Sequence, residues 1–386
     1  MEPMKQGVDE KPGRLEDRHR HVVYLHRQKR RTFENPAEKR HADAFLRLVL
    51  TPWSLPMDNR TTKTRGNRRA GFFRRHAALT FALVLFCGCG HKGPATIMVI
   101  TPTGGLERWE DFDHAVEASA RADAINTELA APQAVTDYTE QAQMVETAID
   151  RHVQGIIVSP AHQLVLNSVL QKAVQAKIPV VIIGSPIAFS ENEFAAFVGW
   201  DEAEAGRLAA RKFVTLLHGG GEVGVVGISP TIESSSLIER AFTEEISKAP
   251  RVKLVGVKYG LSDWARSRQA VLDLLAEHPK LKGIFTTDEF STHAASFAFD
   301  QSGQRRPVLI GISDEVQELN QLKAGQIDAL IISDPRELGA QAMQAMRAAL
   351  SGGNASAYST QLPVYIVDKS SMDSNPVVAG LFSEVH

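Results

Sequence analysis

The sequence predicts an α/β fold made of two doubly wound parallel-sheet lobes. From residue 95 onward, short apolar runs rich in β-branched residues alternate with segments of helical periodicity, which is typical of parallel strands covered by helices on both faces. The clearest unit spans residues 153–186, where the apolar runs 155–158 and 178–183 flank an amphipathic segment at 164–177. A helix between two buried strands forces the strands to lie parallel.

The same alternation continues along the chain. Helical spacing fills most of the intervals, for example at 202–217, 235–248 and 335–350, and a further strand is expected at 361–368. This is more strands than a single hydrophobic core usually holds, so we expect the chain to form two lobes. The other predicted strands, all N-terminal to the one at 361–368, lie at 96–101, 126–131, 155–158, 179–183, 194–199, 222–228, 253–259, 283–286, 307–312 and 327–332.

Length and charge limit the classes of function that the chain can serve. Its 386 residues are 43% hydrophobic and 23% charged, which is ordinary for a soluble protein with more than one domain. Residues 1–75 hold 19 of the 43 lysines and arginines, whereas 36 of the 45 acidic residues come later. This acidic body argues against nucleic-acid binding, because phosphate neutralisation supplies most of that affinity.

The N-terminal region has the features of an export signal that begins late. Residues 1–67 alternate charged and polar residues and are expected to be disordered, or to follow a start codon assigned too early. Residues 68–89 combine a basic cluster, a short apolar run at 77–86 and small residues, as a secretory signal does. A basic cytoplasmic tail on a membrane anchor is the alternative, although the apolar run is too short to span a bilayer.

The only cysteines, Cys87 and Cys89, lie in the sequence FCGCG. They cannot form a disulfide network or a zinc site with residues further along. The segment resembles a bacterial lipobox, in which a small residue precedes the cysteine that is lipidated, and Gly88 makes Cys89 the candidate. Acyl chains there would hold the protein at a membrane. Phe86 replaces the usual leucine, and plain secretion is the alternative.

Candidate ligand-binding residues follow the carboxyl ends of the predicted strands, where parallel α/β sheets bind ligands. Helix N-termini offer free N–H groups there, and two facing lobes make a closable clamp. Carboxylates that accept from two hydroxyls suit a neutral polyol. Each aspartate also stands where a helix cap belongs, so capping alone is the alternative. The polar candidates are Thr101, Ser159, Ser185, Thr287, Asp288, Ser313, Asp314, Ser333 and Asp334.

Three tryptophans, Trp109, Trp200 and Trp264, also follow predicted strands. A flat aromatic face suits the apolar face of a sugar ring, and we expect stacking for Trp109 and Trp264. The alternative is packing within one lobe, which we prefer for Trp200. The histidines lack metal-ligand spacing, and no Ser/His/Asp set can be argued from the order of residues. We therefore expect no metal, no cofactor and no catalysis.

The order of these segments resembles that of the ribose-type periplasmic sugar-binding proteins, type I, of ABC transporters. The likeness spans residues 96–369 and rests on TIMVITPT, GIIVSPAHQ, AKIPVVIIGSP, GIFTTDE, VLIGISDE and GQIDALIISDP. It implies two lobes joined by a hinge of three crossovers, with the ligand in the cleft. The implied N-lobe comprises residues 95–199 plus 334–361, and the C-lobe comprises residues 200–333 plus 362–386.

Carried over residue by residue, the resemblance implies a set of ligand contacts. The family's ribose binders have an Asp-Arg pair after the fourth strand and a second arginine after the sixth, where this chain has Gly184-Ser185 and Ser236. Without these two arginines the chain lacks the bidentate donors that they offer to hydroxyl groups, which argues against ribose as the ligand. Anionic ligands are also disfavoured, while a cationic ligand stays open. The implied contacts are Trp109, Ser159, Ser236, Trp264, Thr287, Ser313 or Asp314, and Ser333.

The resemblance also implies a function and its partners. We expect a monomeric, lipid-anchored periplasmic protein that captures a sugar-like ligand and delivers it to an ABC transporter permease. A sensory module that reports the ligand to a membrane receptor or kinase is the alternative. An intracellular regulator of the lactose-repressor type shares the lobes, but no helix-turn-helix pattern precedes residue 95.

Overall fold

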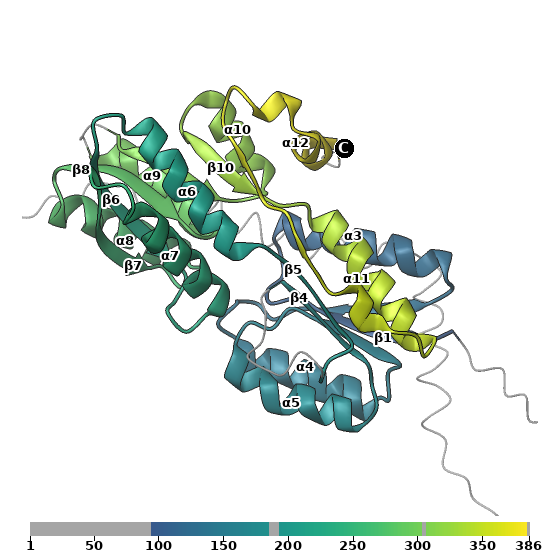
Figure 1. Cartoon of the computed structure of the whole chain (residues 1–386). Helices are drawn as coiled ribbons and strands as arrows, with labels where there is room; N and C mark the ends of the chain where they lie inside the picture. The colour runs from purple at the N-terminus through teal and green to yellow at the C-terminus, as the bar shows by residue number, and fades with distance from the viewer. Residues whose placement is uncertain (1–93, 185–192, 303–305, 384–386) are drawn as a thin grey trace, which may run out of the picture. The chain divides into compact units, whose positions relative to one another are not determined.

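The computed structural model describes residues 94–184, 193–302 and 306–383. The predicted disordered segment, the export signal with Cys89, and Ser185 lie outside the described residues. Within the described part, no helix combines the length and hydropathy that crossing a membrane requires. The described residues form two six-stranded sheets, one in each lobe (Figure 1), and this confirms the predicted α/β class with two doubly wound lobes.

The N-lobe sheet is parallel throughout. Its strand β1 (Thr96–Ile100) is apolar on both sides: Ile97 and Val99 pack into one core, whereas Met98 and Ile100 pack into the other. Successive side chains of a strand point to opposite faces, which is why a doubly covered strand appears as an unbroken apolar run. The sheet order is β11 (Thr360–Leu362), β5 (Ala196–Trp200), β4 (Val180–Gly184), β3 (Gly155–Val158), β1 and β2 (Asn126–Ala130).

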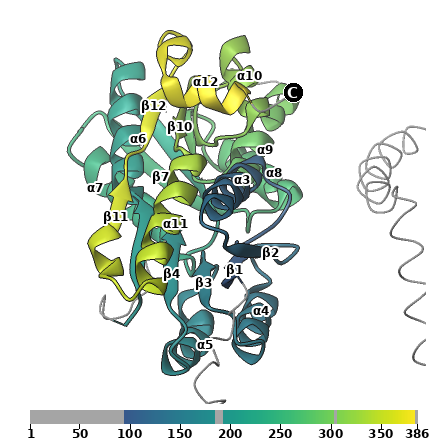
Figure 2. The ribbon, with the colours of Figure 1, turned by 90° about the vertical axis from the view of Figure 1, so that its right-hand side faces the viewer.

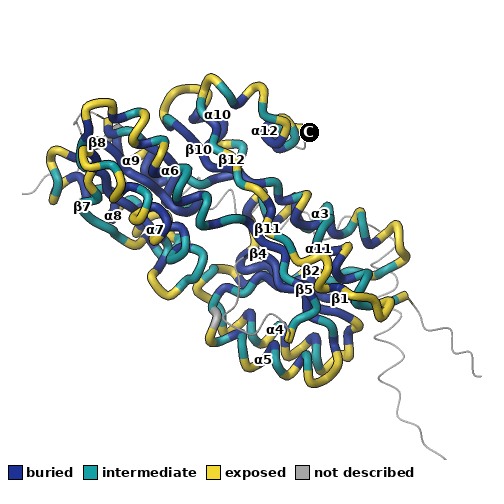
Figure 3. Tube along the Cα trace, viewed as in Figure 1, coloured by how far each residue is buried: buried dark blue, intermediate teal, exposed yellow. Residues whose placement is uncertain are grey.

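Helices cover both faces of the N-lobe sheet. One pair contributes Phe112 and Met343 to the core that contains Ile97, and the other contributes Val145 and Leu166 to the opposite core. Figure 3 shows the resulting buried strands between helices whose outer sides are exposed. The first pair is α3 (Glu107–Ala122) and α11 (Pro335–Leu350), and the second is α4 (Tyr138–Asp150) and α5 (Gln163–Gln175).

The C-lobe repeats this plan with one reversed strand at its edge. Strand β12 (Tyr365–Val367) runs antiparallel to β10 (Ala329–Ile332), and the other pairings are parallel. From β12 and β10 the sheet continues through β9 (Val308–Ile312), β8 (Leu281–Thr286) and β6 (Gly221–Gly227) to β7 (Val252–Tyr259) at the far edge.

Of the helices in the described part of the chain, two pack on one face of the C-lobe sheet and four pack on the other. Phe242 of the first pair stacks on Phe285 of the sheet, and Phe213 packs edge-on against Phe242 in the same core. The opposite core takes side chains such as Leu274 and Leu319 from the remaining helices. The first face carries α6 (Glu202–Leu216) and α7 (Glu233–Ile246), and the second carries α8 (Trp264–Glu277), α9 (Glu289–Ser302), α10 (Val316–Ala324) and α12 (Pro376–Ser383).

Three crossovers join the lobes. The chain leaves the N-lobe after Trp200, returns after Ser333, and crosses again between β11 and β12. The single strand expected at 361–368 is therefore two short strands, one in each sheet, because the segment at Pro363 and Val364 carries the chain from one lobe to the other (Figure 2).

Candidate functional site

A cavity of about 140 Å³ lies between the two lobes. Its walls come from the carboxyl ends of strands in both sheets. In the N-lobe, Ser159 follows β3 and Gly184 ends β4, while in the C-lobe Thr287 follows β8 and Ser333 follows β10. The cavity thus occupies the place where open α/β sheets bind ligands.

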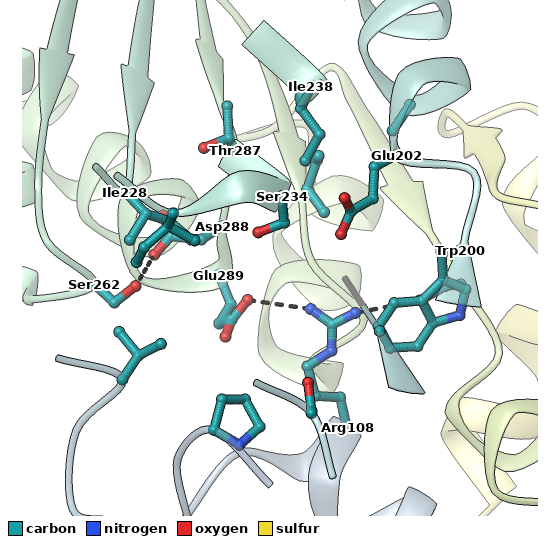
Figure 4. A pocket seen from close by; sticks show the side chains of 18 of the residues that line it. Arg108, Trp200, Glu202, Ile228, Ser234, Ile238, Ser262, Thr287, Asp288 and Glu289 are labelled. Carbon is teal, nitrogen blue, oxygen red and sulfur yellow. Dashed lines mark hydrogen bonds and ion pairs between the residues drawn. The ribbon is translucent and has the colours of Figure 1, made fainter. Parts of the chain in front are cut away.

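Asp288 forms part of the C-lobe wall just before α9 (Figure 4). Its carboxylate accepts hydrogen bonds from the backbone N–H of Ser291 at 3.1 Å and from the Ser262 hydroxyl at 2.9 Å. Burial raises the pKa of Asp288, although these hydrogen bonds act in the opposite direction. The carboxylate therefore caps α9 and faces the cavity at the same time, so the two roles considered for this residue are compatible.

Arg108 reaches across the cavity from the first turn of α3. Its guanidinium lies 3.0 Å from a carboxylate oxygen of Asp314, 3.4 Å from Glu289 and 3.3 Å from the Ser333 hydroxyl. Figure 4 shows it between Glu289 and Trp200. Burial acts to lower the pKa of Arg108, but the carboxylates of Asp314 and Glu289 outweigh burial and raise it. Arg108 therefore stays charged and links the lobes by charge-assisted hydrogen bonds.

Two tryptophans of the N-lobe support this guanidinium. The Arg108 Cζ atom lies 4.8 Å from the ring centroid of Trp200 and 5.8 Å from that of Trp109, within the range of cation–π attraction. Trp109 also packs edge-on against Phe112, and the two indoles are only 7% and 9% exposed. Packing in the N-lobe core and lining the cavity are thus combined in the same two rings.

The first turns of α3 and α10 face each other at the rim of the cleft. Glu315 of the C-lobe accepts hydrogen bonds from the backbone N–H groups of Glu107 at 3.1 Å and Arg108 at 3.3 Å. The Glu107 carboxylate in turn accepts from the backbone N–H of Val316 at 2.8 Å. The N-cap residue of neither helix supplies a side-chain cap, so each helix is capped by a glutamate of the opposite lobe.

Several carboxyl groups around Arg108 have raised pKa values. Burial raises the pKa of Glu289 to about 7, against the attraction of Arg108. Burial, together with the nearby Glu289, raises the pKa of Glu315 to about 8. The pKa of Asp314 is also raised by burial. Glu289 and Glu315 therefore titrate close to neutral pH, whereas for Asp314 burial opposes the charged form and the charge of Arg108 favours it.

Five of the residues predicted from the sequence to bind the ligand line the cavity. Asp314 lies directly behind the wall, where it accepts hydrogen bonds from the backbone N–H of Ser333 at 2.6 Å and from the Ser333 hydroxyl at 2.8 Å. Thr101 and Ser313 are buried nearby and bond to Thr103 and Glu318. The five that line the cavity are Trp109, Ser159, Thr287, Asp288 and Ser333.

Three other predicted residues lie away from the cavity. The Ser236 hydroxyl donates to the carbonyl oxygen of Pro230 at 3.0 Å. Trp264 begins α8 and is 44% exposed. Asp334 caps α11 by accepting from the backbone N–H of Arg336 at 3.1 Å, which is the alternative role considered for it.

The cavity also contains residues that sequence reasoning missed. Ser234 and Ile238, one turn apart on α7, line it, whereas Ser236 between them does not, because only every third or fourth residue of a helix shares a face. Arg108 was missed although it directly precedes Trp109. Among the described residues, no group of three or more His, Cys, Asp and Glu side chains could hold a metal ion.

Comparison with known proteins identifies the family. A family model described as a periplasmic binding protein domain matches residues 97–354. The chain belongs to this periplasmic binding protein family. The D-allose-binding periplasmic protein of Escherichia coli (strain K12) is 23% identical over 259 residues, which cover 65% of this chain and 83% of that protein. The relatives are binding proteins of transport systems and not enzymes.

Solved structures of periplasmic binding proteins have the same fold. A solute-binding protein of an ABC transporter from Agrobacterium vitis, bound with α-D-tagatopyranose, superposes with a TM-score of 0.70 at 21% identity, covering 74% of this chain and 98% of that chain. Another from Agrobacterium vitis, with bound D-fucose, gives a TM-score of 0.67 at 26% identity over 74% of this chain and 99% of that chain. The resemblance to sugar-binding proteins is thereby confirmed.

Proposed function

We propose that this chain is the extracytoplasmic solute-binding component of an ABC importer and that it holds a neutral, hydroxylated ligand of monosaccharide size between its lobes. The observation that carries the proposal is the cavity between the carboxyl ends of both sheets, with polar groups contributed by each lobe. Its volume of about 140 Å³ suits a small ring compound better than an oligosaccharide. The sugars named for related binding proteins support the same ligand class.

The composition of the wall favours a ligand with one polar and one apolar side. Thr287, Asp288 and Ser159 offer hydroxyl and carboxylate groups for hydrogen bonds. The indoles of Trp109 and Trp200 and a set of isoleucines supply apolar surface. A ring with hydroxyls on its edge and C–H groups on its face meets both needs. These isoleucines are Ile228, Ile232, Ile238, Ile312, Ile331 and Ile332.

The decisive experiment is a ligand screen of the full chain. Neutral monosaccharides and deoxysugars, sugar phosphates, sugar acids and amino sugars would be compared by thermal shift and then by calorimetry. We expect a neutral sugar to give the largest rise in melting temperature, with a Kd in the micromolar range, about −8 kcal/mol. Thr287→Val should weaken this binding, and Ser236→Ala should leave it unchanged. Selective binding of an anionic compound would contradict the proposal.

Attachment to a membrane through acylated Cys89 completes the proposed role. Metabolic labelling with palmitate should mark the wild-type chain and the Cys87→Ala variant equally. Label should be lost in Cys89→Ala. Label that persists in Cys89→Ala would remove the lipid anchor from the proposal without affecting the ligand site.

An uptake assay separates import from sensing. Cells that lack this protein should take up the identified sugar more slowly, and the Thr287→Val variant should restore uptake less than wild type does. Unchanged uptake, together with a lost transcriptional response to the sugar, would instead assign the protein to a sensory pathway.

A further inference from the structure

We propose that Arg108 determines the charge of the ligand that the cleft accepts. Its guanidinium fills a cation site made by Glu289, Asp314 and Ser333 of the C-lobe, so that the closed cleft takes an uncharged ligand. This inference deepens the proposed function and rests on it for the identity of the ligand as a sugar. The cation site itself is defined by the contacts of Arg108 alone.

The contacts of the guanidinium are those of a built cation site. The carboxylates of Asp314 and Glu289 approach it to 3.0 and 3.4 Å, and their side chains are only 1% and 12% exposed. The ring of Trp200 supplies an aromatic face 4.8 Å from the Arg108 Cζ atom. Carboxylates on one side and an aromatic face on the other are how proteins bind planar organic cations.

Arg108 supplies positive charge beside acidic residues of the cavity wall. Among the described residues that line the cavity, Arg108 is the only lysine, arginine or histidine, and the acidic Asp288 and Glu289 lie near it in the same wall. Burying carboxylates without a counter-charge is costly. If Arg108 were absent, an amine or guanidine on the ligand would be the group best suited to replace it.

The position of Arg108 links this selection to closure of the lobes. The residue belongs to the N-lobe, and its own backbone N–H is capped by Glu315 of the C-lobe. The guanidinium therefore meets Glu289 and Asp314 only when the rim of the cleft is shut. A cationic ligand would compete with Arg108 for the same carboxylates, and the competition would oppose closure. A neutral ligand leaves the pairing intact.

Chemical rescue tests the cation site without any sugar. In Arg108→Ala, millimolar methylguanidinium should raise the melting temperature saturably by several degrees, and neutral methylurea should not. Wild type and Arg347→Ala, whose removed arginine pairs with Asp123 in the N-lobe, should not respond. Arg108→Gln provides a second variant if Arg108→Ala does not fold. Absence of a saturable response in a folded variant would overturn the cation site.

The second experiment measures how strongly the protein prefers a neutral ligand over a positively charged one. For the sugar found in the screen and its amino analogue, wild type should prefer the neutral compound at least tenfold, and Arg108→Ala should reduce or reverse this ratio at least tenfold. An unchanged ratio would overturn the role of Arg108. If no sugar binds wild type, the proposed function fails, whereas the methylguanidinium arm still decides the cation site.

Discussion

Glu107 and Glu315 exchange helix caps across the cleft. Each glutamate lies at the start of a helix in its own lobe and accepts a backbone hydrogen bond from the helix of the other lobe, at 2.8 Å for Glu107 and 3.1 Å for Glu315. Helix N-terminal N–H groups need acceptors, and here each acceptor comes from the opposite lobe. Separation of the lobes would remove these acceptors, so the contacts at the rim favour the arrangement in which the lobes meet.

The first prediction concerns this exchange. Glu315→Ala removes the acceptor for two N–H groups of α3, and we expect it to shift the ligand-free protein toward open forms, since a helix cap is worth about 1 kcal/mol. Small-angle scattering and a pair of spin labels, one in each lobe, would measure the shift. Asp263→Ala is the matched control, because Asp263 caps α8 within the C-lobe. The Asp263→Ala substitution should lower the free energy of unfolding by a similar amount without opening the cleft. Equal scattering from both variants would refute the prediction.

The second prediction is that acid stabilises the closed protein. Burial raises the pKa of Glu289 to about 7 and that of Glu315 to about 8, above the value of about 4.3 expected in the unfolded chain. The folded protein thus binds protons that the unfolded chain has released. The stabilisation is complete below about pH 4 and is lost as the pH rises through 7 to 8.

Melting temperatures between pH 5.5 and pH 8.5 would measure this effect. We expect a fall across the range, and a shallower fall in Glu315→Gln, which cannot titrate but keeps a carbonyl acceptor. Asp113, whose pKa burial raises to about 7, contributes a fall of the same sign in both proteins. Glu146→Gln at the exposed surface pair with Lys172 serves as the control. Identical slopes in wild type and Glu315→Gln would count against the prediction.

The third prediction separates the two roles of Asp288. Asparagine caps helices about as well as aspartate, so Asp288→Asn should fold with nearly the wild-type melting temperature. It should bind a hydroxylated ligand about tenfold more weakly, since charge-assisted bonds are roughly twice as strong as neutral ones. Calorimetry of ligand binding gives the answer. Undiminished affinity would mean that Asp288 is only a cap.

The fourth prediction concerns the packing of α6 against α7. A Cβ atom at Gly206 would lie 2.2 Å from the Ile238 carbonyl oxygen and 2.8 Å from the Phe242 nitrogen, and backbone atoms cannot yield as side chains do. We expect Gly206→Ala to destabilise by about 1–3 kcal/mol, although alanine favours helices by about 1 kcal/mol. Urea denaturation would test this. Gly219→Ala, where nothing lies within 4 Å of the added atom, is the control.

The strands could be predicted because burial on both faces leaves a local signal. Runs such as Gly155–Val158 are wholly buried, so every position is apolar whatever the rest of the chain does. The break at Pro363 could not be recognised in the same way, because two short strands in different sheets form one apolar run. Which sheet each joins is decided by tertiary contacts.

Only part of the candidate site could be predicted, because some of its residues are placed by a strand and others by contacts between the lobes. Ser159, Thr287 and Ser333 follow strands directly, and the strand fixes where they lie. Arg108 was missed because an arginine in the first turn of a helix is opposed by the helix dipole and would ordinarily extend into solvent. Its partners Glu289 and Asp314 lie about two hundred residues further along the chain and in the other lobe.

Two of the connections between the lobes run side by side. Strands β5 and β11 pair up to Trp200 and Leu362, and just beyond, the Asp201 N–H donates to the Leu362 carbonyl oxygen at 3.0 Å. The two connections are thus tied to each other by backbone hydrogen bonds up to the point where they leave the N-lobe. A rotation of one lobe against the other must carry both connections together or break these bonds.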